Sequence, residues 1–396
     1  MEGKATKYRW QDGNACELLI NGEQFFAAAF TAIRAAQQQI LLETFIIFAD
    51  EVGQGLKVAL LEAAARGVRI EVTVDGYGTA DLSRDYIDEL AGAGVRMHIY
   101  DPRDRLLGMR TNLFRRLHRK LLVVDGKVAF IGGINFGADH LPESYPMAKQ
   151  DYAVRVTGPI VADIHDACRR LLLDKDAVTD LPPLTPASGH SPAAMLLAIR
   201  DNHRNRDDIE EQYLQAIRQA NRRVVLANAY FFPGYRMLRA LRSAARRGVR
   251  VTLILQGAPD MPWARLFSSL LYGYLLRDGV SVCEFIERPL HAKVAVVDEH
   301  WSTVGSSNLD PLSLSLNLEA NLFIRDTSFN CLLHQHLMSL VDNHCQQITA
   351  RIAKRGYWWR APLILASFHF LRHFPAIVGW LPAHTAKLKP LGEPPR

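Results

Sequence analysis

Two segments of this chain carry the same spaced pattern of a histidine, a lysine and an aspartate. The six residues are His118, Lys120 and Asp125 in the first segment and His291, Lys293 and Asp298 in the second. A chain of 396 residues is expected to match such a pattern by chance about 0.05 times, because each residue type has an abundance of about 5%. The duplication therefore predicts two copies of one functional unit.

Each pattern is preceded by a similar series of secondary-structure signals. Apolar runs that are typical of buried strands occupy residues 39–48, 65–74, 223–232 and 246–255. The segments between them are rich in alanine and leucine, and Gly67 and Gly248 suit the position that follows a helix. Such units also arise by chance, but the two motifs favour a true repeat. We expect an α/β protein with two homologous halves, each a mixed β-sheet flanked by helices.

A proline-rich segment marks the boundary between the two halves. Four prolines fall within residues 179–192, where neither a helix nor a central strand can continue. We expect a first half at 1–178, a linker at 179–200, a second half at 201–350 and an amphipathic C-terminal segment at 351–396.

The motif residues suit a phosphate chemistry that needs both halves. The strand period of two places His118 and Lys120 on one face, and a glycine-rich turn that ends in asparagine follows each motif. One histidine per half is too few for nucleophilic and acid–base roles together, so we expect the halves to form one pseudo-twofold active site. The residues expected to bind the phosphate from these turns are Gly133, Asn135, Ser306 and Asn308.

The duplicated motif followed by the turn resembles the signature of the phospholipase D superfamily over roughly residues 20 to 350. Within that superfamily the chain looks like the bacterial cardiolipin synthases, most closely the B-type enzymes. The segments that carry this finer resemblance are residues 229–234, 305–321 and 369–380.

The resemblance implies transfer of a phosphatidyl group through a phosphohistidine, with phosphatidylglycerol as donor and acceptor and glycerol as leaving group. By analogy His118 is the nucleophile and His291 the general acid and base, although the repeat leaves the opposite assignment open. Phosphatidylethanolamine remains an alternative donor, and water an alternative acceptor. A nuclease or another phosphodiesterase of the same superfamily is the rival function.

Two further carboxylates and the motif aspartates complete the expected site. Asp151 and Glu319 each open a strand-like stretch after the turn, where a carboxylate could fix the tautomer of a histidine; the alternative is an ordinary surface position. Asp125 and Asp298 are expected to be orienting rather than to touch substrate. We expect no cofactor and no metal, because the motif segments lack a cluster of acidic ligands.

Charge and amphipathic segments favour an anionic lipid partner. The net charge is +6, and residues 103–116, 261–276 and 357–382 combine apolar with basic or aromatic side chains, which suits a membrane interface as well as helices packed on the core. No apolar run reaches about 18 residues. We therefore expect peripheral attachment to the cytoplasmic side of the bacterial inner membrane, with anionic phospholipids rather than nucleic acid as partners; the oligomeric state stays open.

Overall fold

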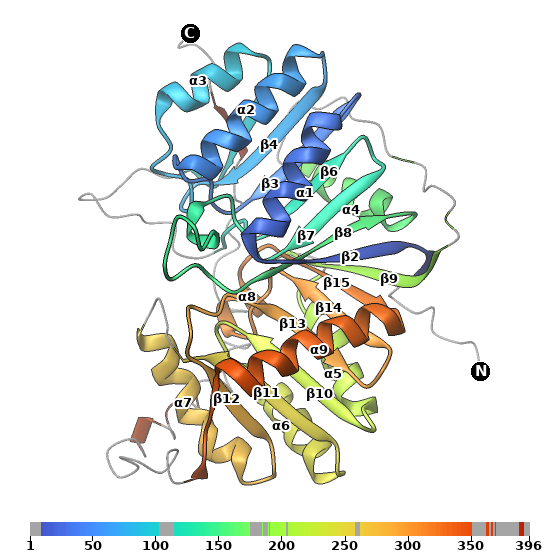
Figure 1. Ribbon diagram of the computed structural model, residues 1–396, viewed down its shortest axis with the longest axis vertical. Helices are drawn as coiled ribbons and strands as arrows, with labels where there is room; N and C mark the ends of the chain where they lie inside the picture. Colours follow the sequence, from blue (N-terminus) through green and yellow to red (C-terminus); the bar gives the residue numbers. More distant parts are fainter. Residues whose placement is uncertain are drawn as a thin grey trace.

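The computed structural model describes residues 9–102, 115–174, 184, 189, 191–202, 205–257, 262–350, 362, 363, 366, 369 and 388–391, with the side chains of 262–265, 267 and 312 left aside. Figure 1 shows two layered α/β halves, one above the other, the first in blue to green and the second in yellow to orange. Each half contains one mixed sheet, which confirms the predicted fold class.

The sheet of the first half has the strand order β17-β5-β4-β3-β6-β7-β8-β2 among the described residues. Strands β3, β4 and β5 are parallel, and the other pairs are antiparallel. The bounds are β2 Ala15–Ile20, β3 Gln39–Thr44, β4 Arg69–Asp75, β5 Arg96–Tyr100, β6 Leu121–Val124, β7 Val128–Gly132, β8 Tyr152–Thr157 and β17 Leu388–Leu391.

The sheet of the second half has the order β1-β9-β15-β14-β13-β10-β11-β12-β16 over the same described part of the chain. Its parallel strands are β10, β11 and β12. The bounds are β1 Gln11–Gly13, β9 Ser191–Arg200, β10 Arg223–Asn228, β11 Arg250–Gln256, β12 Ser281–Phe285, β13 Lys293–Val297, β14 Trp301–Gly305, β15 Glu319–Arg325 and β16 Cys345–Gln347.

Helices cover both sheets. Those of the first half are α1 Asn21–Ala35, α2 Glu51–Ala65, α3 Arg84–Gly92, the 3₁₀ turn η1 Ala138–His140 and α4 Ile160–Asp174. Those of the second are α5 Asp208–Gln219, α6 Tyr235–Arg246, α7 Pro262–Leu276, α8 Pro311–Ser315 and α9 Thr327–His344. Helices α1 to α3 share a core with the first sheet, and α5 to α7 share one with the second.

The predicted β-α-β units are present in both halves. In the first, β3 and β4 pair in parallel across α2, and in the second β10 and β11 pair in parallel across α6. Gly67 and Gly248 follow these helices with φ of +82° and +90°, a backbone conformation that glycine adopts at no steric cost. The repeat read from the sequence is therefore a structural repeat.

Three strands belong to a different part of the fold from the one that the sequence predicted. Residues 191–200, the last ten of the expected linker, form β9, which pairs with β15 and places Leu196 and Ala198 in the core of the second half. Strand β1 also joins the second sheet, although its residues lie within the expected first half. Strand β17 returns from the C-terminal segment to pair with β5 of the first sheet.

A third apolar core joins the halves. It combines buried side chains of α4 and α9 with strand residues from both sheets, including Val123, Val154, Val296 and Leu322. Burial of apolar area stabilises contacts by about 25 cal/mol per Å², and this cluster lies where neither half could cover it alone. The two sheets are thus held in one arrangement, and that arrangement positions the motif histidines.

Candidate active site

His118 is placed by main-chain contacts with the other half. The segment that enters β6 runs beside the segment that enters β15, with a parallel bridge between Leu117 and Leu318. The amide of His118 donates to the carbonyl of Leu318 at 2.9 Å, and the amide of Leu318 donates to the carbonyl of Arg116 at 2.8 Å. The backbone of the second half therefore fixes the first histidine.

His291 has the equivalent arrangement in the opposite sense. A parallel bridge joins Leu290 to Gln150 of the first half. The amide of His291 donates to the carbonyl of Gln150 at 2.8 Å, and the amide of Gln150 donates to the carbonyl of Pro289 at 2.9 Å. The two bridges are related by the repeat, so the site has the pseudo-twofold form that the sequence suggested.

Each histidine then meets a carboxylate from the other half. Because the bridged strands are parallel, the residues that follow the bridge lie side by side. His118 Nδ1 is 3.0 Å from Glu319 Oε2, and His291 Nδ1 is 2.6 Å from Asp151 Oδ2. Both carboxylates are fully buried, so the alternative of ordinary surface positions does not apply. A carboxylate on Nδ1 keeps that nitrogen protonated and leaves Nε2 as the nitrogen with a free lone pair.

The two histidine–carboxylate pairs differ in their supporting groups. Ser306 Oγ donates to Glu319 Oε2 at 2.5 Å. The matching residue in the first half is Gly133, where a β-carbon would lie 2.5 Å from Asp151 Oδ1. Ser306 therefore contacts Glu319, and Gly133 leaves room for the Asp151 carboxylate. The phosphate contact expected of both residues stays a prediction.

The carboxylates of the two pairs also differ in pKa. Burial disfavours the ionised form of Glu319, but the hydrogen bonds from His118 and Ser306 and the nearby ammonium of Lys120 outweigh it, and its pKa lies below the usual value. Burial raises the pKa of Asp151 to about 6, although Lys293 opposes the shift. Glu319 is thus the more firmly ionised of the two carboxylates.

The surroundings of both motif histidines favour the neutral imidazole. Burial is the main cause: it lowers the pKa of His118 to about 4, against the pull of Glu319. Burial, followed by the charge of Lys293, also lowers the pKa of His291 well below the usual value. A neutral imidazole can attack an electrophile through Nε2, and a bound anion would raise both pKa values.

The motif lysines lie beside their own histidines. Lys120 Nζ donates to the carbonyl of His118 at 2.7 Å, and Lys293 Nζ donates to the carbonyl of His291. Both side chains are buried, and burial lowers the pKa of Lys120 to about 7. When protonated, two such buried lysines stabilise negative charge on a phosphate far better than they would in water, and a bound anion favours their protonated form.

The asparagines occupy matching positions next to this centre. Asn135 and Asn308 are buried, and the Oδ1 atom of each has no hydrogen-bond partner among the described residues. Oδ1 accepts hydrogen bonds and cannot bind a phosphate oxygen, so a contact with phosphate would have to come from the Nδ2 group of each asparagine. That contact stays a prediction.

Asp125 and Asp298 lie at the far ends of the motif strands. The Asp125 carboxylate accepts hydrogen bonds from the amides of residues 37–39, and the Asp298 carboxylate accepts them from the amides of residues 221–223. Both aspartates have positive φ, at 53° and 48°. They hold the loop before a neighbouring strand, which agrees with an orienting function away from substrate.

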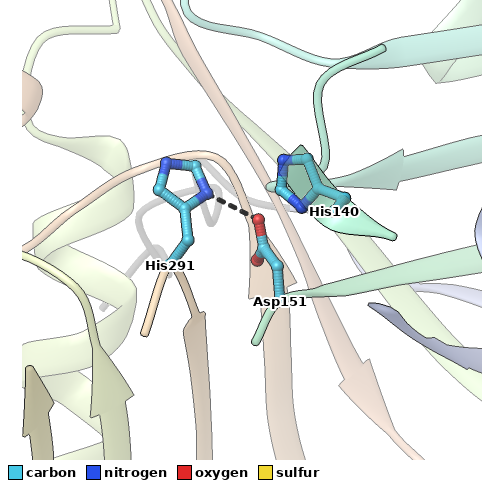
Figure 2. A group of neighbouring side chains, drawn as sticks. All are labelled: His140, Asp151 and His291. Carbon is cyan, nitrogen blue, oxygen red and sulfur yellow. Dashed lines mark hydrogen bonds and ion pairs between the residues drawn. The ribbon is translucent and has the colours of Figure 1, made fainter. Parts of the chain in front are cut away.

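His140 is a residue of this centre that the sequence reasoning missed. Figure 2 shows it on the other side of Asp151 from His291. Its ring centroid lies 5.9 Å from that of His291, and it is fully buried. It follows the turn of the first half without any recurring spacing, so the sequence carried no signal for it. Over the described residues, His140, Asp151 and His291 are the group whose ligand atoms approach closely enough to hold a metal ion.

Of the segments expected at a membrane interface, residues 103–114 and most of 357–382 lie outside the described residues. Residues 262–276 of the other segment form α7, whose Leu271, Tyr272 and Leu275 are buried in the core of the second half. Within the part of the chain that the structure describes, no helix combines the length and apolar character needed to span a bilayer.

Two motifs that share one site through crosswise histidine–carboxylate pairs define an enzyme of the phospholipase D class. The family model for the cardiolipin synthase, phospholipase D-like domain matches residues 30–166 and 213–341, one match in each half. The chain belongs to this family, and it is a phosphatidyltransferase of the phospholipase D superfamily.

Individual relatives agree with the family match. The chain is 53% identical to cardiolipin synthase B of Salmonella typhi over 98% of its own length and 95% of that protein. It is also 53% identical to cardiolipin synthase B of Escherichia coli strain K12 with the same coverage. The crystal structure of phosphatidylserine synthase from Haemophilus influenzae has the same fold, with a TM-score of 0.68, 13% identity, and coverage of 91% of this chain and 97% of that one. The predicted resemblance to B-type cardiolipin synthases is confirmed.

Proposed function

We propose that this protein makes cardiolipin and glycerol from two molecules of phosphatidylglycerol through a phosphohistidine intermediate. The observation that carries the proposal is the pair of motif histidines, each held by a carboxylate of the opposite half. A chemical step that needs a nucleophile and a separate acid at one phosphorus fits this arrangement. The identity to cardiolipin synthases B supports the choice of lipid substrate.

In the first step His118 Nε2 attacks phosphorus, and the bond from phosphorus to the glycerol oxygen breaks. His291 donates a proton to the leaving oxygen, so free glycerol departs. In the second step His291 takes the proton from a glycerol hydroxyl of the second phosphatidylglycerol. The freed oxygen attacks phosphorus, and His118 is released as the neutral imidazole.

The assignment of His118 as nucleophile draws support from its carboxylate. Formation of a phosphohistidine puts positive charge on the imidazole, and Glu319, with its lowered pKa, is ionised to balance that charge. His291 must carry a proton before the first step. The negative charge of the bound phosphodiester offsets the ammonium groups that lower its pKa, which favours protonation on substrate binding.

The motif lysines and the turn asparagines would bind the phosphate group. Lys120 and Lys293, with Asn135 and Asn308, would hold the non-bridging oxygens as charge builds on them. Asp125 and Asp298 would keep the motif strands in place. No residue of the chain changes its role between the two steps except His291, which first gives and then takes the proton.

We further propose that the protein acts at the cytoplasmic surface of the bacterial inner membrane, attached peripherally. Its substrates keep their acyl chains in the bilayer, and the basic and apolar residues 103–116 and the aromatic residues 357–359 suit an anionic interface. The domain limits proposed are those of the sequence analysis, with residues 191–200 moved into the second half because they form β9.

The test is to incubate the purified protein with labelled phosphatidylglycerol in mixed micelles and to separate the lipids. Cardiolipin with an equal amount of glycerol is the expected product. Phosphatidic acid alone would show that water is the acceptor and would overturn the synthase proposal. Turnover of DNA or RNA without any lipid turnover would assign the site to the nuclease branch instead.

A further inference from the structure

His140 is buried beside the active site with both ring nitrogens unused. It is 0% exposed, and neither Nδ1 nor Nε2 has a hydrogen-bond partner among the residues that the structure describes. Its Nε2 is 3.9 Å from Asp139 Oδ1, which is too far for a hydrogen bond. A buried imidazole with two unsatisfied nitrogens costs free energy, so the position calls for a ligand that completes it.

The neighbours of His140 supply a set of metal ligands. One ligand atom from each of His140, Asp151 and His291 lies within 4.8 Å of the other two, and all three residues are buried. Figure 2 shows Asp151 between the two imidazoles, with its carboxylate directed to the space that they share. Small adjustments would bring the three atoms to the distances of about 2.0–2.2 Å that zinc requires.

The chemical types of the three ligands indicate which metal ion would bind. Two imidazole nitrogens and one carboxylate oxygen are the set that Zn²⁺ and similar transition ions prefer, with water at a fourth position. Magnesium and calcium need more oxygen ligands than this group offers. Burial keeps imidazoles neutral, which is the form that binds a metal.

In the described part of the second half there is no equivalent set of ligands. Counted from the matching asparagines Asn135 and Asn308, the residue that corresponds to His140 is Ser313, whose hydroxyl is a poor zinc ligand. Glu319 has the Ser306 hydroxyl as its additional partner. The candidate ligands therefore belong to one of the two histidine–carboxylate pairs.

We propose that His140, Asp151 and His291 form a reversible Zn²⁺ site whose occupation inhibits the enzyme. Zinc would take Asp151 and one nitrogen of His291 out of their mutual hydrogen bond. His291 could then no longer exchange a proton with the departing or arriving alcohol. The proton on Nδ1 would move to Nε2 or to solvent when Nδ1 binds the ion, so no redox step is involved.

The surrounding charge makes the ion an inhibitor rather than a permanent component. Lys120, Lys149 and Lys293 all place positive charge near His140 and His291. These ammonium groups oppose a dication and lower its affinity. An anionic phosphodiester is attracted by the same lysines, so substrate and zinc are expected to compete.

Binding is tested first without lipid, so that its outcome does not depend on the proposed function. The metal-free full-length protein is titrated with Co²⁺, whose visible absorption identifies tetrahedral coordination, and then with Zn²⁺ by calorimetry. A tetrahedral Co²⁺ spectrum displaced by one equivalent of Zn²⁺ is expected. A wild-type protein without such a spectrum would overturn the proposal, whatever the variants do.

The variant His140→Gln removes one ligand and keeps a polar side chain. Its Zn²⁺ affinity is expected to fall by at least about 10–100-fold, the loss that disturbing a ligand shell usually causes. His165→Gln is the matched control, since His165 is also a fully buried histidine with an unpartnered nitrogen, and its contact is with Gln39 rather than a carboxylate. Equal Zn²⁺ affinity of all three proteins would mean adventitious binding and would overturn the proposal.

Inhibition is measured on lipid transfer and rests on the proposed function. Zn²⁺ should inhibit the wild type and His165→Gln at the same concentration, and His140→Gln only at a concentration at least about tenfold higher, each relative to its own rate without metal. Zinc bound at the site without any loss of transfer would refute inhibition while leaving the binding site in place.

Discussion

His118 Nδ1 of the first half and Glu319 Oε2 of the second are joined at 3.0 Å, although they are far apart in the sequence. The parallel bridge between Leu117 and Leu318 produces this contact, because it sets the next residue of each strand side by side. The repeat creates the same relationship between His291 and Asp151. Neither motif histidine is paired with a carboxylate of its own half, which gives the duplication a physical reason.

Glu319→Gln should remove the charge that supports His118 without removing its side-chain volume. We expect kcat to fall by about 10²–10⁴-fold with little change in KM, because the carboxylate acts on the transition state. Steady-state transfer kinetics measure this. Glu71→Gln is the matched control, since Glu71 is a buried carboxylate 2.8 Å from His98, outside the active site. Equal losses in both variants would point to a general effect on folding and against our account.

Ser306→Ala should shift the pH dependence. The Ser306 hydroxyl helps to hold the pKa of Glu319 below its usual value, so its loss raises that pKa. Glu319 then loses its charge at a higher pH, and the acidic limb of the kcat/KM profile is expected to move upward in pH. Thr303→Val serves as control, because the Thr303 hydroxyl donates to a main-chain carbonyl. If the acidic limb of Ser306→Ala stays where it is in the wild type, the ionisation of Glu319 does not control that limb, and our account is contradicted.

Gly133→Ala tests how tightly Asp151 is positioned. A β-carbon at this place would lie 2.5 Å from Asp151 Oδ1, so the carboxylate must shift from the position in which it contacts His291. Misplacement of a catalytic contact by about 1 Å can cost about 10²-fold, and we expect kcat to fall by that order. The control is Gly92→Ala, where nothing lies within 4 Å of the added carbon. Full activity of Gly133→Ala would show that the contact with Asp151 is dispensable.

Asp298→Asn should affect stability more than turnover. The carboxylate accepts three main-chain hydrogen bonds and has a pKa below the usual 3.8, despite some burial that opposes it. A lowered folded-state pKa stabilises the fold at pH values above 3.8, and this contribution is lost as pH falls through the folded pKa. We expect a loss of about 1 kcal/mol at pH 7 that disappears at strongly acid pH. Urea unfolding at both pH values measures it; a constant difference would contradict the assignment to ionised Asp298.

Much of the fold could be predicted because its signals are local. The β-α-β units follow from apolar runs and from Gly67 and Gly248, whose positive φ confirms the expected helix ends. Asp151 and Glu319 were predicted as partners of imidazoles from their places after the turns. Which histidine each would meet depended on the bridges between halves, which no local pattern encodes.

The remaining features arise from tertiary structure. His140 lies beside Asp151 at the end of the 3₁₀ turn η1, and its sequence context resembles that of any surface histidine. Strands β1 and β17 are short and gain their stability from edges of existing sheets rather than from their own composition. Proline spacing indicated a break near residue 180 but could not show that a strand begins at Ser191.

The most direct test of a single shared site is the rate of cardiolipin formation by His118→Ala and His291→Ala, each assayed alone. One composite site predicts that either substitution reduces the rate to background, because nucleophile and acid act on the same phosphorus. Two independent half-sites would instead leave each variant with about half of the wild-type rate. That second result would contradict the crosswise arrangement as the basis of catalysis.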